Sequence, residues 1–353
     1  MSPFPGALLA VEYHLPEQVL SNAELARQHP AWRVDQTEKK TGVSARHVAA
    51  PGETAYDLGL RACQKLLDQH PGLRERIDAV IFCTQSPDYV MPSNAFLLQR
   101  DLGLRCALLA FDFNLACSGY VHGLLMASSF MKTGIARNVL LVTADTYSRY
   151  IADTDRATRM LFGDGASASW IGEPGQCGVA PLIRSFDDFT CAADGTGWDK
   201  FSIKSGGARH PAEAASDSRA RDADADADGD GVGDGDGDSK IAMNGIQIVN
   251  FVNHRVVRQI VELLAKNGLR ADQIDQYLLH QGSKLALDSI TKRLGVGNTR
   301  VHSNLQHLGN TVSSSIPILI KDYFSQHSLA AGSRLLLCGF GAGFSWSSLL
   351  AST

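Results

Sequence analysis

A cysteine in a tight turn is the residue of this sequence whose surroundings best suit nucleophilic chemistry. Cys117 follows an apolar, strand-like run that ends near Asn114, and residues 121–132 have the composition of a buried helix. Near a helix N-terminus, free backbone N–H groups and the helix dipole favour the thiolate, which is the reactive form of the side chain. Cys117 is therefore a candidate nucleophile. The alternative role is that of a small buried hydrophobic residue.

Two polar residues in the second half of the chain complete a possible catalytic group. His280 lies at the end of a predicted strand, and Asn310 lies in a Gly-Asn-Thr turn. Taken singly, each is more often structural at such a place, since asparagine is common in turns. Together with a cysteine they suit acyl transfer through a thioester intermediate.

An internal duplication explains how these residues could meet. Segments of the first half align in order with segments of the second half: 77–83 with 274–280, 114–119 with 304–309, and 140–143 with 335–338. We predict an N-terminal half, 1–175, that carries the nucleophile and a C-terminal half, 176–353, that carries the histidine and the asparagine. Ligands of open α/β sheets bind at the carboxyl ends of the strands. We therefore expect Cys117 to face Asn310, with His280 on a neighbouring strand end.

The composition limits the class of protein. A hydrophobic content of 44% and a charged content of 20% are ordinary for a globular enzyme. No apolar run approaches the roughly 20 residues of a membrane span, and the N-terminus lacks the pattern of a secretory signal. The seven cysteines are scattered, with no CxxC pair, which favours reduced thiols in a cytoplasm over disulfides or a zinc site. We expect a cytoplasmic protein that binds no metal, nucleic acid or membrane.

Residues 205–239 interrupt the duplicated plan. Within them, 217–238 hold nine Asp and two Arg, a sum of −7, so the rest of a chain of net charge −4 carries +3. The alternation at 224–230 resembles a DxDxDG calcium loop, but the glutamate expected at loop position twelve is missing. The composition predicts a disordered acidic insertion, and a calcium-dependent binding module is the alternative.

Seven motifs in order give the chain a family resemblance. It resembles β-ketoacyl-acyl-carrier-protein synthase III, a branch of the thiolase superfamily, over nearly its whole length except the acidic insertion. The motifs are Pro92-Ser93, 116–120, 155–158, 161–166, His280-Gln281, 309–311 with 315–317, and 339–346. The resemblance implies an α/β thiolase fold of five αβαβα layers built from two duplicated halves. It also implies a homodimer, an acyl carrier protein as partner, and thioester substrates with no further cofactor.

The resemblance assigns a role to each candidate residue. Cys117 would take an acyl primer from a thioester, while the backbone N–H groups of Cys117 and Ala342 stabilise the oxyanion. His280 and Asn310 would donate hydrogen bonds to the thioester carbonyl of a malonyl group on the carrier protein. Loss of carbon dioxide leaves an enolate, which attacks the acyl-cysteine. The reaction is a decarboxylative Claisen condensation, in fatty-acid or specialised acyl or polyketide biosynthesis.

Residues that contact the substrate depart from the family pattern. The resemblance implies an acyl pocket at Met91, Phe162 and Phe340, and contacts to coenzyme A or phosphopantetheine at Arg156, Gln36 and Ser283. Of these, Met91 replaces a Phe that reaches across the dimer, Gln36 replaces a Trp that stacks on adenine, and Ser283 replaces an Asn; Leu285 also replaces an Arg. Arg156 is kept. An intact triad with altered substrate contacts indicates a specialised relative rather than the housekeeping initiator of fatty-acid synthesis.

A basic surface is the expected docking site of the carrier. Lys284 and Lys292 fall on one helix face by their spacing; the complete predicted surface is Arg255, Arg258, Lys284, Lys292 and Arg293.

Three alternatives to condensation with malonyl carrier protein stay open. The enzyme could acylate an alcohol or amine, it could condense and cyclise two β-ketoacyl thioesters, or the chain could be a non-catalytic partner subunit. The intact triad disfavours the last.

Overall fold

The computed structural model describes residues 4–175, 178–211 and 239–353. Residues 212–238, most of the predicted acidic insertion with its calcium-like stretch, lie outside the described residues. The start of that insertion differs from the prediction, because residues 205–211 form a turn in which the Gly206 N–H donates to the His210 carbonyl at 2.7 Å. Ser205, at its base, is buried.

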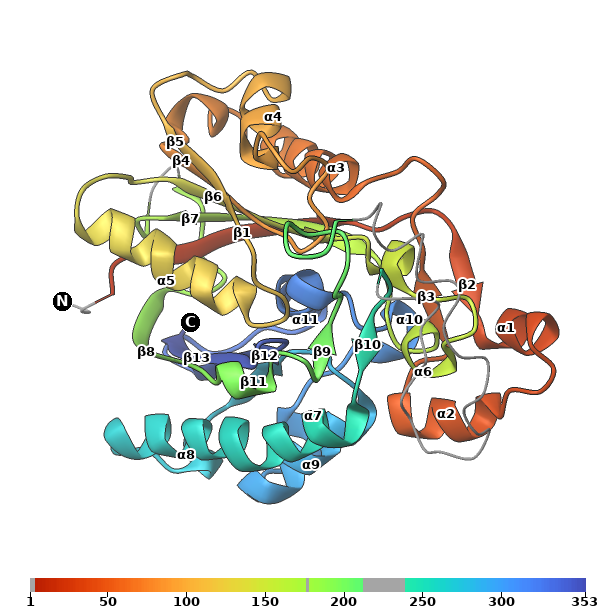
Figure 1. Ribbon diagram of the computed structural model, residues 1–353. Helices are drawn as coiled ribbons and strands as arrows, with labels where there is room; N and C mark the ends of the chain where they lie inside the picture. Colours follow the sequence, from red (N-terminus) through yellow and green to blue (C-terminus); the bar gives the residue numbers. More distant parts are fainter. Residues whose placement is uncertain (1–3, 176–177, 212–238) are drawn as a thin grey trace.

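Two sheets of matching topology form the frame of the molecule (Figure 1). The first has the order β1-β7-β6-β4-β5, with β1 (Ala7–His14), β4 (Ala79–Cys83), β5 (Leu109–Phe113), β6 (Val139–Asp145) and β7 (Gly165–Gly172). The second has the order β11-β12-β13-β8, with β8 (Ser185–Ala193), β11 (Gln276–Leu279), β12 (Arg334–Gly341) and β13 (Ser345–Ser352). In both sheets two antiparallel pairings are followed by a parallel one.

The second sheet has one isolated bridge at the place where the first sheet has its fifth strand. A parallel bridge joins Tyr277 to Val301 beyond β11, where β5 lies beyond β4 in the first sheet. The predicted segment pairs correspond, since 77–83 contains β4 and 274–280 contains β11. The predicted boundary at 175/176 falls between β7 and β8, which belong to different sheets, and the division into two halves stays a prediction.

Helices separate and cover the two sheets, giving five layers (Figure 1). α5 (Gly119–Lys132) and α11 (Ser315–Gln326) lie between the sheets and contact both. α3 (Ala55–Gln69) and α4 (Asn94–Asp101) cover the first sheet from outside, and α8 (Val257–Lys266) and α9 (Lys284–Leu294) cover the second. β4 and β6 are buried along their whole length, as strands with helices on both faces must be. None of the described helices is long and apolar enough to cross a membrane.

One predicted helix is divided. After residues 240–245, where the ordered chain resumes, the sequence predicts one helix to about Lys266. The structure has β10 (Ala242–Met243), α7 (Gly245–Phe251), a π-helical turn (Val252–Val256) and then α8. π-turns inside helices are frequent at functional sites. Here the turn follows Phe251, the last residue of α7.

Smaller elements lie at one end of the sheets. They are β2 (Val19–Ser21), α1 (Asn22–Gln28), α2 (Val34–Thr41), β3 (Ala45–His47), α6 (Arg156–Arg159), β9 (Phe201–Ser202) and α10 (Leu305–Leu308). Ser21 caps α1 by accepting the Glu24 N–H at 3.1 Å. α2 and α6 lie on the same side of the molecule (Figure 1), and both contribute residues to the cavity described below.

Candidate active site

Cys117 lies between the N-terminus of helix α5 and the end of strand β12. It lies two residues before α5, and its side chain is only 2% exposed. Two glycines of β12 allow this approach. A Cβ on Gly339 would lie 2.6 Å from the Cys117 carbonyl oxygen, and a Cβ on Gly341 would lie 3.2 Å from Cys117 Sγ. The backbone of the 339–342 segment therefore passes directly beside the thiol, and the Ala342 amide follows Gly341 in that segment.

The surroundings of Cys117 act on its thiol in two opposite directions. Burial raises the pKa of the Cys117 thiol well above its ordinary value, and the nearby carboxylate of Asp145 raises it further. A helix terminus contributes roughly 0.3–2 kcal/mol, whereas complete burial can shift a pKa by about 3–5 units. Desolvation therefore opposes the helix dipole and favours the neutral thiol in the unliganded site.

His280 lies at the end of β11 as a neutral side chain. It is 2% exposed, and its Nδ1 lies 2.6 Å from the Ser315 hydroxyl. Its ring meets Phe340 edge-on, with 5.2 Å between centroids. Burial lowers the pKa of His280 to about 3. When Ser315 donates to Nδ1, the ring proton lies on Nε2, so the imidazole can donate a hydrogen bond without carrying charge.

The hydrogen bonds of Asn310 fix its side-chain oxygen and leave its amide nitrogen able to donate to a ligand. Its Oδ1 accepts the Val312 N–H at 2.9 Å, and its Nδ2 has only a long contact, 3.5 Å, to the Gly282 carbonyl. The backbone of Asn310 is fixed as well, because its N–H donates to the Leu161 carbonyl at 2.9 Å. The turn brings Val312 into the left-handed region, with φ of 53°, a costly conformation for a β-branched residue.

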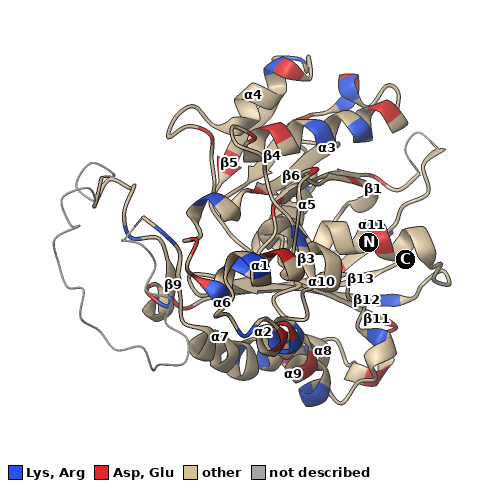
Figure 2. Ribbon diagram, turned by 90° about the vertical axis from the view of Figure 1, so that its right-hand side faces the viewer, with Lys and Arg blue, Asp and Glu red and all other residues tan. Residues whose placement is uncertain are grey.

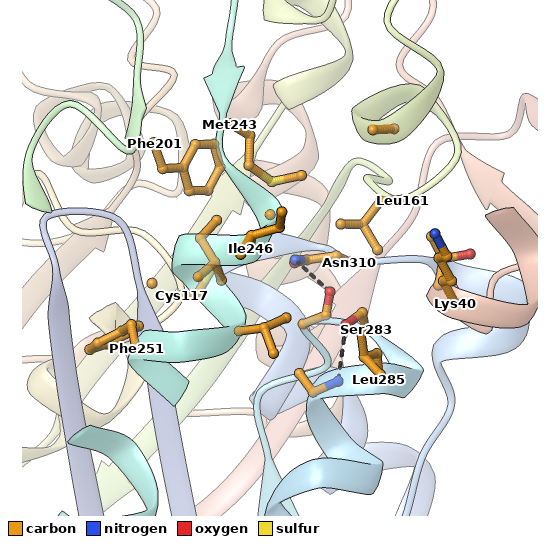
Figure 3. A pocket seen from close by; sticks show the side chains of 18 of the residues that line it. Lys40, Cys117, Leu161, Phe201, Met243, Ile246, Phe251, Ser283, Leu285 and Asn310 are labelled. Atoms are coloured by element: carbon orange, nitrogen blue, oxygen red, sulfur yellow. Dashed lines mark hydrogen bonds between the residues drawn. The ribbon is translucent and has the colours of Figure 1, made fainter. Parts of the chain in front are cut away.

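One cavity of about 500 Å³ joins the three residues. Cys117, His280 and Asn310 all line it, together with the predicted contacts Phe162, Phe340, Arg156 and Ser283. Figure 3 shows Lys40 at one side of the cavity and Phe251 and Phe201 at the other, nearer Cys117. The cavity thus has a cationic side and an aromatic side.

Two predicted contacts do not line the cavity of their own chain. Gln36 is exposed, and the adjacent turn of α2 contributes Thr37, Lys40 and Thr41 instead. Spacing of three and four residues on one helix face is the sequence signal that could have identified these three. Gln36 is one residue out of that register. Met91 is 80% exposed, and its predicted place in the acyl pocket of a dimer partner stays a prediction.

Beyond Phe162 and Phe340, further residues on the aromatic side of the cavity were not predicted from the sequence. Its lining there includes Phe201, Met243, Phe251 and Phe344. Phe201 and Met243 are register partners in the short pair β9–β10. This pair flanks the acidic insertion, so its two members are far apart in the sequence, and neither strand is long enough to show a periodic pattern.

The predicted docking cations are all exposed, and most have partners. Arg255 pairs with Asp194 at 3.6 Å and Arg258 with Glu262 at 2.7 Å. Lys284 pairs with Asp288, and Arg293 Nε donates to Asn253 at 3.1 Å. Such surface pairs are weak, of about 0–1 kcal/mol, and a protein partner can replace them.

Among the described residues, no cluster of His, Cys, Asp or Glu could hold a metal ion.

Known proteins share both the sequence and the fold. The family model described as 3-oxoacyl-[acyl-carrier-protein (ACP)] synthase III matches residues 111–184, and the model of its C-terminal part matches 264–352. The chain is 36% identical over 340 residues to the β-ketoacyl-[acyl-carrier-protein] synthase III of Gloeobacter violaceus, covering 96% of this chain and 95% of that one. It is 32% identical over 349 residues to that of Chlamydia caviae, with coverage of 98% and 96%.

A solved structure gives the same result. A crystal structure of a 3-oxoacyl-(acyl-carrier-protein) synthase III superposes with a TM-score of 0.89 at 39% identity, covering 99% of this chain and 100% of that one. The predicted thiolase fold and the family resemblance are confirmed. The chain belongs to the β-ketoacyl-acyl-carrier-protein synthase III family.

Proposed function

We propose that this protein joins an acyl primer, held as a thioester on Cys117, to malonyl-acyl carrier protein by decarboxylative Claisen condensation. The observation that carries the proposal is the meeting of Cys117, His280 and Asn310, each at most 4% exposed, at one cavity. The relatives named above are β-ketoacyl-acyl-carrier-protein synthases III, which supports the same reaction.

In the first half-reaction the Cys117 sulfur attacks the carbonyl carbon of the primer thioester. A new C–S bond forms, the original C–S bond breaks, and the thiol proton leaves with the departing thiol. Negative charge develops on the carbonyl oxygen. The backbone N–H groups of Cys117 and Ala342 are the proposed donors to it, since Gly341 brings this segment against the sulfur.

In the second half-reaction His280 and Asn310 act on the malonyl thioester. His280 Nε2–H and Asn310 Nδ2 donate to its carbonyl oxygen. The carboxylate leaves as carbon dioxide, and its bonding electrons form an enolate that the two donors stabilise. The enolate carbon attacks the acyl-cysteine, which forms the C–C bond and expels the Cys117 thiolate. The high pKa of the buried thiol makes the thiolate take up a proton from solvent, which restores the starting state.

Replacing Ser315 should affect condensation but not acylation of Cys117. Ser315 is a positioning residue, because its hydroxyl orients His280 through Nδ1 at 2.6 Å. One net hydrogen bond is worth about 0.5–1.5 kcal/mol. We expect Ser315→Ala to lower the condensation rate about 2- to 10-fold while the acylation burst is unchanged, and Ser315→Thr to restore condensation. Single-turnover assays of each half-reaction measure both. Equal losses in the two half-reactions would indicate a general structural defect instead.

We propose further that the primer arrives on a carrier protein rather than on coenzyme A. The tryptophan nearest to the family's adenine-stacking position, Trp32, is already stacked on His29, with 3.9 Å between ring centroids. Gln36 points into solvent rather than into the cavity. Coenzyme A therefore lacks an aromatic platform here, whereas a carrier-borne thioester does not use one.

Basic side chains near the cavity mouth support an acidic protein partner. Lys40 on α2 lines the cavity, and α2 contacts α9, which carries Lys284, Lys292 and Arg293. Figure 2 shows Lys and Arg on both helices. Electrostatic complementarity of this kind mainly raises association rates.

Charge reversal on α9 should weaken use of the carrier. We expect Lys284→Glu with Lys292→Glu to lower carrier-dependent kcat/KM about 10-fold or more, and added salt to lower it in the wild type, since such encounters are electrostatically steered. Reversal of Lys65 and Lys132, on α3 and α5, is the matched control. Turnover is compared for one acyl group on carrier protein and on coenzyme A. Equal use of both forms, with no loss on reversal of α9, contradicts the docking proposal.

We also propose a homodimer and a cytoplasmic location. β5 is the open edge of the first sheet, and Tyr89, Val90, Met91 and Phe96 expose apolar side chains on the neighbouring loop and helix. Unprotected edges and apolar surface favour pairing with a second copy, which would bring Met91 to a partner. The six cysteines of the described residues are free, which supports a reducing compartment.

Two other second half-reactions are compatible with an acyl-Cys117: transfer of the acyl group to an alcohol or amine, and condensation with cyclisation of two β-ketoacyl thioesters. Neither consumes malonyl carrier protein with release of one carbon dioxide for each bond formed. A carbon dioxide assay with malonyl carrier protein therefore distinguishes them from the proposed reaction. A non-catalytic subunit is disfavoured, because all three residues are present and line one cavity.

A further inference from the structure

The carboxylate of Asp145 is a buried charge that neither proposed half-reaction uses. Asp145 is the last residue of β6 and is fully buried. It is near enough to Cys117 for its charge to raise the pKa of that thiol. Asp145 takes part in none of the ion pairs formed by the described residues. A buried charge is costly unless hydrogen bonds stabilise it, so its hydrogen-bond partners indicate what this carboxylate does.

Asp145 joins two loops that approach each other at the end of the first sheet. Its Oδ1 accepts the Gln85 N–H at 2.8 Å, just after β4. Its Oδ2 accepts the Ser313 hydroxyl at 2.5 Å, and the Ser313 N–H lies farther away, at 3.4 Å. The carboxylate is thus fixed against the first sheet and holds a residue that follows Asn310 in the chain.

The turn that contains Ser313 also orients both donors of the second half-reaction. The N–H of Val312 donates to Asn310 Oδ1 at 2.9 Å. The hydroxyl of Ser315 lies 2.6 Å from His280 Nδ1. Residues 312–315 therefore begin and end with the two groups that set the directions of the Asn310 amide and the His280 ring.

The two middle residues of this turn anchor it to the first sheet. The Ser314 hydroxyl donates to the Thr143 carbonyl at 3.0 Å, and the Ser313 hydroxyl donates to Asp145. Of these two acceptors only the carboxylate is charged, and hydrogen bonds to an ionised acceptor are roughly twice as strong as neutral ones. All four residues are at most 1% exposed, so solvent does not replace a lost partner.

We propose that Asp145 is a positioning residue, which orients both donors of the second half-reaction by anchoring Ser313. The inference rests on the proposed function, in which Asn310 and His280 donate to the malonyl thioester. Val312, next to Ser313, has a φ of 53°, a costly conformation that persists only where surrounding contacts hold it. Without the carboxylate, the turn relaxes and both donors are misdirected.

The first half-reaction should not depend on this anchor. Gly341 lies against the Cys117 sulfur, and Cys83 Sγ donates to the Leu115 carbonyl at 3.1 Å, two residues before the nucleophile. Replacing Asp145 with asparagine also removes a negative charge that disfavours the Cys117 thiolate. Acylation should therefore not slow down, whereas a general structural defect would slow both half-reactions.

The test compares the two half-reactions at pH 8. Burial raises the pKa of Asp145 to about 7, so at pH 8 the carboxylate is mainly ionised. For Asp145→Asn we expect kcat of condensation to fall about 10- to 100-fold, the range for a charge-assisted hydrogen bond. The KM for malonyl-acyl carrier protein should be unchanged, and single-turnover acylation of Cys117 should not fall.

Ser313→Ala removes the donor of the same hydrogen bond and gives an independent variant if Asp145→Asn does not fold. It should show the same division between the half-reactions. The double variant should condense no more slowly than the slower single variant, because both changes remove one interaction. Losses that multiply in the double variant would show that the two residues act separately and would overturn the inference.

A second buried carboxylate is the matched control. Asp188, on β8, is 6% exposed, accepts from Asn267 at 2.9 Å and pairs with Lys266 at 2.7 Å, outside the cavity lining. Asp188→Asn should leave both half-reactions unchanged even where it lowers the melting temperature. Condensation at wild-type rates in the Asp145 and Ser313 variants, a parallel fall in acylation, or an equal loss in Asp188→Asn refutes the positioning role. If the wild type itself forms no β-ketoacyl product from malonyl carrier protein, the proposed function fails, and the inference fails with it.

Discussion

Replacing Cys117 with alanine abolishes formation of the acyl-enzyme and leaves the protein folded. The sulfur is the only atom of the described cavity that we propose to bond covalently to substrate, so no residual acylation is expected. Loss of one small buried atom costs little stability, and the neighbouring Gly339 and Gly341 keep their contacts with the backbone of residue 117. Intact mass after incubation with acyl donor measures the adduct, and thermal melting measures the fold.

A second buried cysteine provides the control for this variant. Cys63 on α3 is fully buried and lies in the core outside the first sheet, far from the cavity lining. Cys63→Ala should therefore be acylated like the wild type. An adduct of unchanged yield on Cys117→Ala, or loss of acylation in Cys63→Ala at unchanged melting temperature, is the outcome that the nucleophile assignment does not survive.

Removing either donor of the second half-reaction separates the two halves of catalysis. We expect His280→Ala and Asn310→Ala to acylate Cys117 but to condense about a hundred- to a thousandfold more slowly, the usual loss for one donor to a developing oxyanion. His70→Ala, a histidine outside the cavity, is the control. Single-turnover measurement of β-ketoacyl product from preformed acyl-enzyme gives the rate. Condensation at near wild-type rates in both variants would contradict the assigned roles.

The condensation rate should not depend on titration of His280 near neutral pH. Burial lowers the pKa of His280 to about 3, below the ordinary value of 6.5, so the ring gains a proton only in strong acid. The neutral donor is therefore fully present across pH 5–8, and His280 should produce no inflection in the condensation rate there. An inflection near pH 6.5 that disappears in His280→Ala would show that the imidazole titrates in the working enzyme.

The strands and the central turn of the fold could be predicted because their signals are local. β4 and β6 are unbroken apolar runs, and their counterparts β11 and β12 repeat the pattern in the second half. The division of the helix predicted to end near Lys266 could not be predicted, because a π-turn has no periodic signature of its own. Its position depends on packing of Phe251 against Phe344 and Trp346, residues almost a hundred positions away.

In the candidate site, too, the residues with local sequence signals could be predicted and those that depend on tertiary packing could not. Cys117, His280 and Asn310 were found because each ends an element that the duplication places at one edge. Phe201 and Met243 were missed, because β9 and β10 have only two residues each and flank the acidic insertion. The sequence shows the helix N-terminus that favours the thiolate, but it does not show the complete burial, which raises the pKa of the Cys117 thiol and so opposes the thiolate.

The most direct test of the proposed reaction is a joint count of carbon dioxide and product. Wild-type enzyme is first loaded with its acyl primer, checked by mass for an adduct on Cys117, and then mixed with malonyl-acyl carrier protein. We predict one carbon dioxide released for each β-ketoacyl carrier protein formed, with the adduct on Cys117 lost at the same rate. If the loaded enzyme instead retains its adduct and releases no carbon dioxide, or loses it to a product formed without malonyl carrier protein, the proposed decarboxylative condensation is wrong.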